Sequence, residues 1–257
     1  MDFLLNHPWP LGFLTALLLA GMIEVGRHTA NHFRIQEDSN RKDQMTALRD
    51  GLFVLTGLLF GFTLALAASR FGERRTLLIE EVNAIGMTYL RAETLAEPTR
   101  GQARELLRQY VDARLDFDGA GLDALRAEEA SNRGKKIQEQ LWAGVVDVTK
   151  TDRSPVSVAY MNSLNEVIDL HEKRVSALEN RIPVSIWLLI FCVSTIAIFS
   201  RGLTLARRFW MTVVLAPLTI AIVITLIADV DTPSSGLIRL DERAMLRLKA
   251  DMNSRQP

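Results

Sequence analysis

The sequence has few of the residues on which several common classes of function depend. Only one cysteine, Cys192, stands among the 257 residues, which excludes an intramolecular disulfide and a zinc site built from a cysteine cluster. Lys+Arg and Asp+Glu are equal at 30 each, so the chain lacks the net basic charge with which proteins bind nucleic acid. We therefore expect no nucleic-acid partner.

Motifs for catalysis and phosphate binding are also missing. The sequence contains no Gly-rich phosphate loop, no G-x-S-x-G elbow and no H-E-x-x-H helix. His28 and His32 have the spacing of a metal pair on a helix, but arginines flank them, and we expect a polar stretch that follows a span. The adjacent pairs Glu80-Glu81 and Glu128-Glu129 point about 100° apart on a helix, and we expect both on solvated faces. The sequence predicts neither an enzyme nor a metal or cofactor site.

Long runs without charge are what the sequence does contain. Gly51–Ser69 and Ile182–Ser200 each hold 19 uncharged residues, and Phe209–Ala228 holds 20. At about 1.5 Å per helical residue, each run reaches roughly 28–30 Å, the thickness of the hydrocarbon core of a bilayer. The rest of the chain is too short to bury all three, and the mean hydropathy is positive at +0.11. We interpret the three runs as membrane spans.

The N-terminal run is shorter. It extends without charge over Leu11–Ile23 and ends at Glu24. A signal peptide is the competing interpretation, but the segment has neither a basic start nor a small-x-small cleavage site. Trp9 and the neighbouring prolines are typical of an interfacial anchor that leads into a span. We expect a fourth span here.

Between the second and third spans the apolar residues recur at helical spacing, and strand signals are almost absent. We expect one helix over Leu78–Tyr89 that ends by Pro98, a second that ends at Asp118–Gly121, and a third that begins near Leu122. Ser154 is a predicted N-cap, with Pro155 as the first residue of a fourth helix. The helices next to the spans are expected to continue from them, with weak points only at Gly72 and Pro183.

The fold class that follows is all-α: a polytopic membrane protein with four transmembrane helices and an extramembrane helical bundle. The expected partner of the four transmembrane helices is the lipid bilayer. The predicted organisation is a first span at 1–26, a polar loop at 27–50, a second span at 51–70, a helical domain at 71–181, a third span at 182–200, a short basic loop at 201–208, a fourth span at 209–228 and a C-terminal tail at 229–257.

The second span carries two patterns. Gly57 and Gly61 form a G-x-x-x-G spacing, which allows a neighbouring backbone to approach closely and predicts helix packing there. Val54, Leu58 and Phe62 recur every four residues on another face. In a symmetric oligomer such a stripe could line a pore as a hydrophobic constriction that gates by dewetting. Packing against lipid or a partner helix is an equal alternative from spacing alone.

Two carboxylates mark the end of the last span. Asp229 and Asp231 precede Pro233, where the helix is expected to stop. We expect Asp229 to cap the helix or to pair with an arginine of the helical domain, such as Arg70 or Arg74, and so to tether the spans to that domain.

The stretch LFGFTLALAASRFGERRTLLIEEVNAIGMTYLRAETLAEPTR (Leu59–Arg100) resembles the signature of the bestrophin-like domain family of bacterial membrane proteins. The resemblance continues in LLRQYVDARL (Leu106–Leu115), in Pro183 at the start of a span, and in DVDTPSSGLIRL (Asp229–Leu240). More distantly, the layout of two spans on each side of a helical domain is similar to bestrophins, which are pentameric anion channels.

The resemblance implies a homo-oligomer, with a pentamer favoured, that conducts small inorganic ions. It favours anions, with chloride as the expected permeant ion. It places the hydrophobic neck of the family on Val54, Leu58 and Phe62. The acidic cluster that binds calcium in animal members is reduced here to Asp229 and Asp231, so we expect no calcium site. The alternative is a non-conducting membrane sensor or scaffold whose helical domain docks a partner.

The resemblance also implies that the protein lies in the inner membrane of a bacterium and that its helical domain faces the cytoplasm. The distribution of basic residues does not decide the orientation, because the numbers near the span ends are equal on the two sides. The Arg201–Arg208 loop, with three arginines and no acid, favours the reverse orientation.

Overall fold

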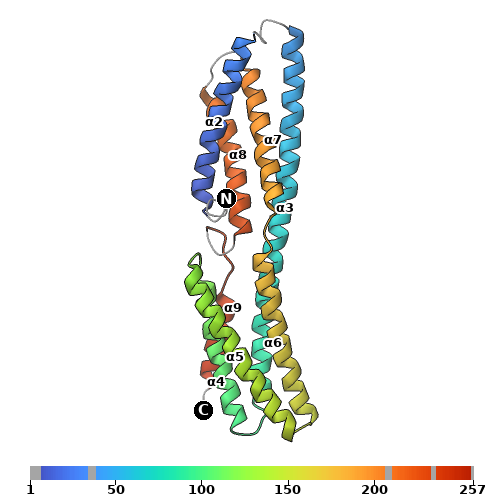
Figure 1. Ribbon diagram of the computed structural model, residues 1–257, viewed down its shortest axis with the longest axis vertical. Helices are drawn as coiled ribbons and strands as arrows, with labels where there is room; N and C mark the ends of the chain where they lie inside the picture. The colour runs from blue at the N-terminus through green and yellow to red at the C-terminus, as the bar shows by residue number, and fades with distance from the viewer. Residues whose placement is uncertain (1–6, 34–38, 206–209, 233–235, 256–257) are drawn as a thin grey trace. The chain divides into compact units, whose positions relative to one another are not determined.

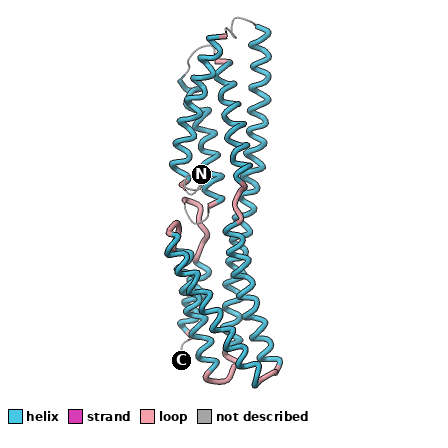
Figure 2. Tube along the Cα trace, viewed as in Figure 1, coloured by secondary structure: helices cyan, strands magenta, loops and turns pink. Residues whose placement is uncertain are grey.

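The computed structural model describes residues 7–33, 39–205, 210–232 and 236–255. Throughout these ranges the regular structure is helical and no strand occurs (Figure 2). The predicted all-α fold class is thus confirmed. The helices, labelled in Figure 1, are α2 (Pro8–His32), α3 (Ser39–Ala92), α4 (Thr99–Gly119), α5 (Ala124–Thr151), α6 (Pro155–Glu179), α7 (Val184–Leu203), α8 (Trp210–Asp231) and α9 (Arg243–Ser254).

Four segments are long and apolar enough to cross a membrane. They lie in α2, in α3, in the segment Pro155–Leu203 and in α8 over Val213–Asp231, where the sequence predicts the four spans. The chain divides into two compact units. We name Met1–Phe71 with Arg181–Ile238 the membrane unit, and Gly72–Asn180 with Arg239–Pro257 the helical domain.

The expected polar loop at 27–50 is largely helical. The α2 helix continues to His32 and α3 begins at Ser39. Neither residues 27–32 nor residues 39–50 contain a glycine or proline, so nothing in these segments breaks a helix. Polar residues can extend a helix beyond a span because its hydrogen bonds are internal. Residues 34–38, the 206–208 part of the basic loop and Pro233 lie outside the described residues.

The two expected weak points behave differently. Helix α3 passes through Gly72 without interruption, since a single glycine in a helix costs only about 1 kcal/mol. Helix α6 ends at Glu179, and α7 begins at Val184 with Pro183 as its N-cap. The prediction of a continuous helix was wrong here, because proline lacks a backbone N–H and disfavours helical geometry at the preceding residue.

The membrane unit is held together by α2, which packs against both α7 and α8 (Figure 1). Its apolar core includes Ile23, Trp187 and Ile224, all almost fully buried. At the crossing of α2 and α7, a Cβ on Gly26 would overlap the carbonyl oxygen of Phe199. A Cβ on Gly202 would likewise overlap the carbonyl oxygen of Ile23. The two backbones therefore meet directly, as small residues allow in membrane helices.

The helical domain has its own core, formed by α3, α4, α5 and α6. Leu107, Tyr110 and Leu164 lie at its centre with no exposed surface or almost none. The predicted N-cap at Ser154 is confirmed, since its hydroxyl accepts a hydrogen bond from the N–H of Ser157. Together with Pro155 at the first helical position, this cap fixes the start of α6.

The predicted C-terminal tail at 229–257 contains a helix that belongs to the domain. Helix α9 buries Met245 and Met252 in the domain core. The hydroxyl of Tyr89 donates to the carbonyl of Met252 over 3.2 Å. A guanidinium nitrogen of Arg104 donates to the carbonyl of Arg255 over 2.7 Å. The helix was missed because α9 is short, at 12 residues, and offers few apolar residues for a helical pattern.

The glycine crossing yields a stability test. Gly26→Ala should lower the thermal unfolding temperature of the purified protein, because overpacking a closely packed site costs about 1–3 kcal/mol. The matched control is Gly21→Ala on the same helix, where a Cβ would meet no atom within 4 Å. That variant should unfold at the wild-type temperature or above it, since alanine favours a helix. Equal unfolding temperatures of the two variants would contradict the crossing.

Candidate pore-lining face and a buried charge network

One side of α3 is left bare within the membrane unit. Val54, Leu58 and Phe62 are 74%, 54% and 67% exposed, and they follow one another at four-residue intervals. On the packed side of the same helix Thr56, Thr63 and Ala67 are buried. The three residues expected to form a constriction therefore lie on a shared apolar face that the subunit does not cover itself.

The polar groups on the packed side are satisfied within the helix. The hydroxyls of Thr56 and Thr63 donate to the carbonyls of Leu52 and Leu59, each over 2.7 Å. Such bonds spare a buried hydroxyl the cost of lacking a partner. The two hydroxyls therefore have a hydrogen-bond acceptor within their own helix.

The glycines of the second span make no close approach inside the subunit. A Cβ added at Gly57 or at Gly61 would meet no atom within 4 Å. The close backbone contact in this unit is the one between Gly26 and Gly202. Packing through Gly57 and Gly61 thus stays a prediction, and it requires a helix from outside the subunit.

The two carboxylates at the end of α8 bind backbone groups. Asp229 accepts hydrogen bonds from the N–H groups of Leu237 and Ile238 at 2.9 and 3.0 Å. Asp231 accepts from the N–H of Ile182 at 3.2 Å, which joins the end of α8 to the segment before α7. Asp229 therefore caps the chain that turns back after the span, because hydrogen bonds from backbone N–H groups stabilise a carboxylate.

Arg74, the other half of the expected tether, binds the end of α6. Its guanidinium is almost fully buried and donates to the carbonyls of Ala177 and Asn180 at 2.9 and 3.0 Å. The last carbonyls of a helix carry partial negative charge, which favours an arginine there. Arg70 lies one turn earlier on α3 and is half-buried. A tether between spans and domain through these four residues stays a prediction.

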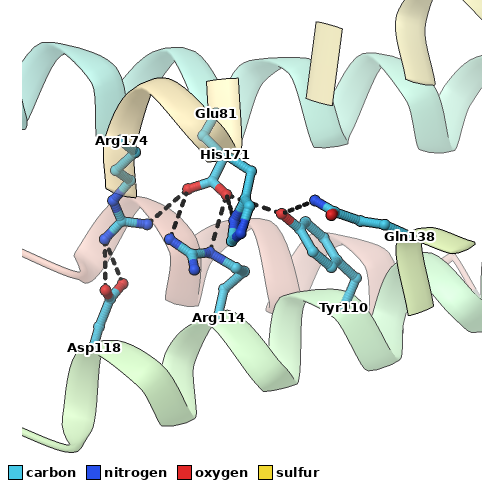
Figure 3. A network of polar contacts seen from close by, with 7 residues as sticks. All are labelled: Glu81, Tyr110, Arg114, Asp118, Gln138, His171 and Arg174. Atoms are coloured by element: carbon cyan, nitrogen blue, oxygen red, sulfur yellow. Dashed lines mark hydrogen bonds and ion pairs between the residues drawn. The ribbon is translucent and has the colours of Figure 1, made fainter. Parts of the chain in front are cut away.

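The helical domain contains a buried network of charged and polar side chains, shown in Figure 3. At its centre is Glu81 of α3, which has no exposed surface. One carboxylate oxygen of Glu81 lies 3.0 Å from Nε of Arg114 on α4. The other accepts a hydrogen bond from Arg174 of α6 over 2.7 Å. The network therefore connects three helices through one carboxylate.

Further groups complete the network. Arg174 also donates to both carboxylate oxygens of Asp118 at 2.6 and 2.7 Å. The hydroxyl of Tyr110 donates to Glu81 and accepts from the side-chain amide of Gln138 on α5, both over 3.1 Å. His171 of α6 also lies in the cluster, with its Nδ1 3.8 Å from a carboxylate oxygen of Glu81. The two carboxylates, Glu81 and Asp118, balance the charges of the two arginines, Arg114 and Arg174.

Burial alone would raise the pKa of Glu81, but the charges of Arg114 and Arg174 outweigh it and hold this pKa far below its usual range. Burial also raises the pKa of Tyr110, and the nearby charge of Glu81 raises it further. Tyr110 is therefore a neutral hydrogen-bond donor to a permanently charged acceptor. Glu81 and Tyr110 therefore keep fixed charge states near neutral pH, and their contacts hold the helices together.

The expectation that both residues of Glu80-Glu81 lie on solvated faces was wrong for Glu81. Glu80 is exposed and Glu81 is buried, because adjacent residues on a helix point to different sides. The sequence did contain a signal: Glu81 falls on the apolar stripe formed by Leu78, Val82 and Ile85. A carboxylate on such a stripe needs cationic partners from neighbouring helices.

A metal centre finds no support in the geometry. Over the described ranges, no three His, Cys, Asp or Glu side chains gather as a metal-binding group. His28 and His32, the pair with suitable spacing, both lie at the exposed end of α2.

A family model named bestrophin-like domain matches residues 13–245 of the sequence. The chain belongs to the bestrophin-like domain family. This match begins within the first span, includes the other three spans and Gly72–Asn180 of the helical domain, and ends within α9. No curated protein matches the sequence. The resemblance read from Leu59–Arg100 is thereby confirmed.

Solved structures agree with the fold of this bestrophin-like chain. A bacterial bestrophin homologue from Klebsiella pneumoniae matches with a TM-score of 0.67 and 15% sequence identity, over 95% of this chain and 99% of the homologue. A variant of that homologue matches with a TM-score of 0.65 and 14% identity, over 95% and 99% of the two chains. Identities this low show a shared fold, and the chain is a multi-pass membrane protein of that fold.

The network gives a test by substitution. Glu81→Gln should lower the free energy of unfolding by about 3–5 kcal/mol, because it leaves two buried arginines without their shared counter-ion. Glu80→Gln, which removes an exposed carboxylate from the adjacent position, should change it by less than about 0.5 kcal/mol. Chemical denaturation of both purified variants measures the difference. A Glu81→Gln variant as stable as Glu80→Gln would show that the network does not hold the helices.

The same carboxylate predicts a pH dependence. The pKa of Glu81 is lowered on folding from its ordinary value of 4.5. Its stabilisation is therefore fully present above that pH and is lost as the pH falls below it. Wild-type protein should lose stability more steeply than Glu81→Gln between pH 5 and lower values, as thermal unfolding across a pH series would record. Parallel curves would contradict the assignment.

Proposed function

We propose that this chain forms an ion channel of bestrophin-like build, assembled as a closed homo-oligomer with five copies favoured. The observation that carries the proposal is the bare apolar stripe of Val54, Leu58 and Phe62 on α3. Large apolar side chains that a subunit leaves exposed on one face are covered by lipid or by other copies. Membership of the bestrophin-like family favours other copies arranged around an axis.

The glycines support the same arrangement. Gly57 and Gly61 lie on α3 beside the stripe and have free space over their Cα atoms. In a ring, the helix of a neighbouring copy can approach closely at these two positions. Each copy would then place its second span nearest the axis, with the stripe turned toward the lumen.

The stripe has the dimensions of a hydrophobic gate. From Val54 to Phe62 is eight residues, so the apolar wall is about 12 Å long at 1.5 Å per residue. Rings of such side chains exclude water when the lumen is narrow and conduct hydrated ions when it widens. We propose that the constriction controls whether ions pass.

The permeant species are small inorganic ions, in the inner membrane of a bacterium. The likeness to bestrophins supports anions, with chloride as the first ion to test. The stripe itself contains no ionisable group, so it selects by hydration and width. Charge selectivity must arise elsewhere along the path.

The alternative is a non-conducting sensor or scaffold whose helical domain docks a partner. It is favoured by apolar side chains that α5 leaves on the outside of the domain. Leu125 is 75% exposed and Trp142 is 37% exposed. A conducting protein would exclude this alternative as the main function.

Ion flux tests the gate. Leu58→Ala and Phe62→Ala should each raise chloride flux into vesicles reconstituted with the purified protein, and the double variant should raise it further. Each truncation widens the lumen and weakens dewetting. Flux is followed with a halide-sensitive dye trapped in the vesicles, at equal protein content.

The matched control for Leu58 is Leu188→Ala. Leu188 is 58% exposed on α7, against 54% for Leu58 on α3, so the two truncations remove similar surface from different helices. Leu188→Ala should leave the flux at the wild-type value. A double variant that assembles normally but conducts no better than wild type would show that the stripe serves packing alone.

A further inference from the structure

A pocket of about 240 Å³ lies in the helical domain, where α3 meets α9 and the residues just before it. Arg75 and Asn83 of α3 border the pocket, and Arg247 of α9 borders it from the other helix. Apolar side chains complete the lining, among them the buried Leu78 and the half-buried Ala244. Two guanidinium groups and an amide therefore share one pocket with a hydrocarbon surface.

The two helices that carry these groups are held together by contacts outside the pocket. Met245 and Met252 of α9 are buried in the domain core, and the hydroxyl of Tyr89 donates to the carbonyl of Met252 over 3.2 Å. A Cβ added at Gly86 would lie 3.3 Å from a methyl carbon of Leu248, so the helices approach closely there. The fold, and not an attraction between the pocket residues, brings the two arginine positions together.

The charges of the two arginines are not neutralised by the domain. Arg133, which is also exposed, pairs with Asp116 over 2.6 Å. By contrast, within the described part of the chain neither Arg75 nor Arg247 has a hydrogen-bond acceptor or a carboxylate at ion-pair distance. Two like charges that border one pocket repel each other, and an anion between them is attracted to both.

One carboxylate also borders the pocket, and it is already engaged. Asp241 accepts a hydrogen bond from the backbone N–H of Arg243 over 3.0 Å, and Nε of Arg243 lies 3.6 Å from the same oxygen. This pair is formally neutral, so the pocket keeps the two positive charges of Arg75 and Arg247. A phosphate monoester carries a charge of about −1.5 to −2 near neutral pH, which complements them.

The donor groups also suit a phosphate. A guanidinium presents a planar fork of N–H groups that binds two phosphate oxygens at once, and the amide of Asn83 adds further donors. A phosphate monoester offers three terminal oxygens to these three groups. Its organic part can lie against the apolar lining at Leu78 and Ala244. A carboxylate carries a single charge and would leave one arginine unneutralised.

We propose that this pocket binds a small organic phosphate monoester, whose phosphate lies between Arg75 and Arg247 and accepts a hydrogen bond from Asn83. Because two of these residues belong to α3 and the third to α9, the bound ligand connects the two helices. The site does not depend on conduction, and it would exist equally in a non-conducting protein.

Calorimetric titration of the purified full-length protein in detergent tests the site, with phenyl phosphate as the probe. Wild type should bind one phenyl phosphate per chain, and inorganic phosphate should bind more weakly because it lacks an apolar part. Arg75→Gln and Arg247→Gln should each weaken the binding by about tenfold or more. Arg126→Gln, which removes an exposed arginine of the same domain outside the pocket, should bind as wild type does.

Hydrogen exchange tests whether the ligand connects the helices. Phenyl phosphate should slow amide exchange in α9 of wild type and leave it unchanged in Arg247→Gln. Asn83→Asp, which keeps the side-chain size but adds a negative charge, should also weaken binding and replaces any arginine variant that does not fold.

Wild-type protein that binds no phenyl phosphate would overturn the site, and so would binding that the pocket variants leave unchanged. Inorganic phosphate that binds as tightly as phenyl phosphate would overturn the assignment to an organic ester.

Discussion

The structure depends on a helix, α3, that is packed on one side only. Its residues Leu78, Ile85 and Tyr89 lie in the core of the helical domain, and Ala67 lies in the core of the membrane unit. The same 54-residue helix leaves Val54, Leu58 and Phe62 without cover from its own chain. A helix with one satisfied side and one bare apolar side is complete only when other molecules cover the bare side. The proposed channel follows from that incompleteness.

The two units solve the problem of polar groups in different ways. In the membrane unit, threonine hydroxyls bond to carbonyls of their own helices, and close packing comes from the contact of Gly26 with Gly202. Where no water competes, such internal satisfaction is required of every polar group. In the helical domain, Glu81 stands between two arginines, and burial is tolerated because the charges balance.

Much of the fold was predictable from the sequence because the signals were local. Uncharged runs predicted the spans, and Ser154 with Pro155 predicted the start of α6. The break before α7 was underestimated, although Pro183 marked it, because the apolar periodicity continues on both sides. What the sequence could not provide were pairings across helices. The partners of Glu81 and the contact of Gly26 with Gly202 join residues far apart in the chain, and one sequence carries no record of them.

The contacts of the candidate pore face could not be predicted from one sequence either. The four-residue spacing identifies Val54, Leu58 and Phe62 as a stripe, and the structure adds that the subunit leaves the stripe exposed. Neither the spacing nor a single subunit contains the neighbour that covers it. The glycines at 57 and 61 have open space above them for the same reason. The missing element is the arrangement of copies, which is a property of the assembly.

The most direct measurement is a cryo-EM map of the full-length protein in lipid nanodiscs. Our account predicts a closed ring in which α3 of every copy lies nearest the axis, with Leu58 and Phe62 turned toward a narrow axial path. A dimer without an axial path, or a ring with α2 or α8 on the axis and the stripe of α3 facing lipid, would contradict it.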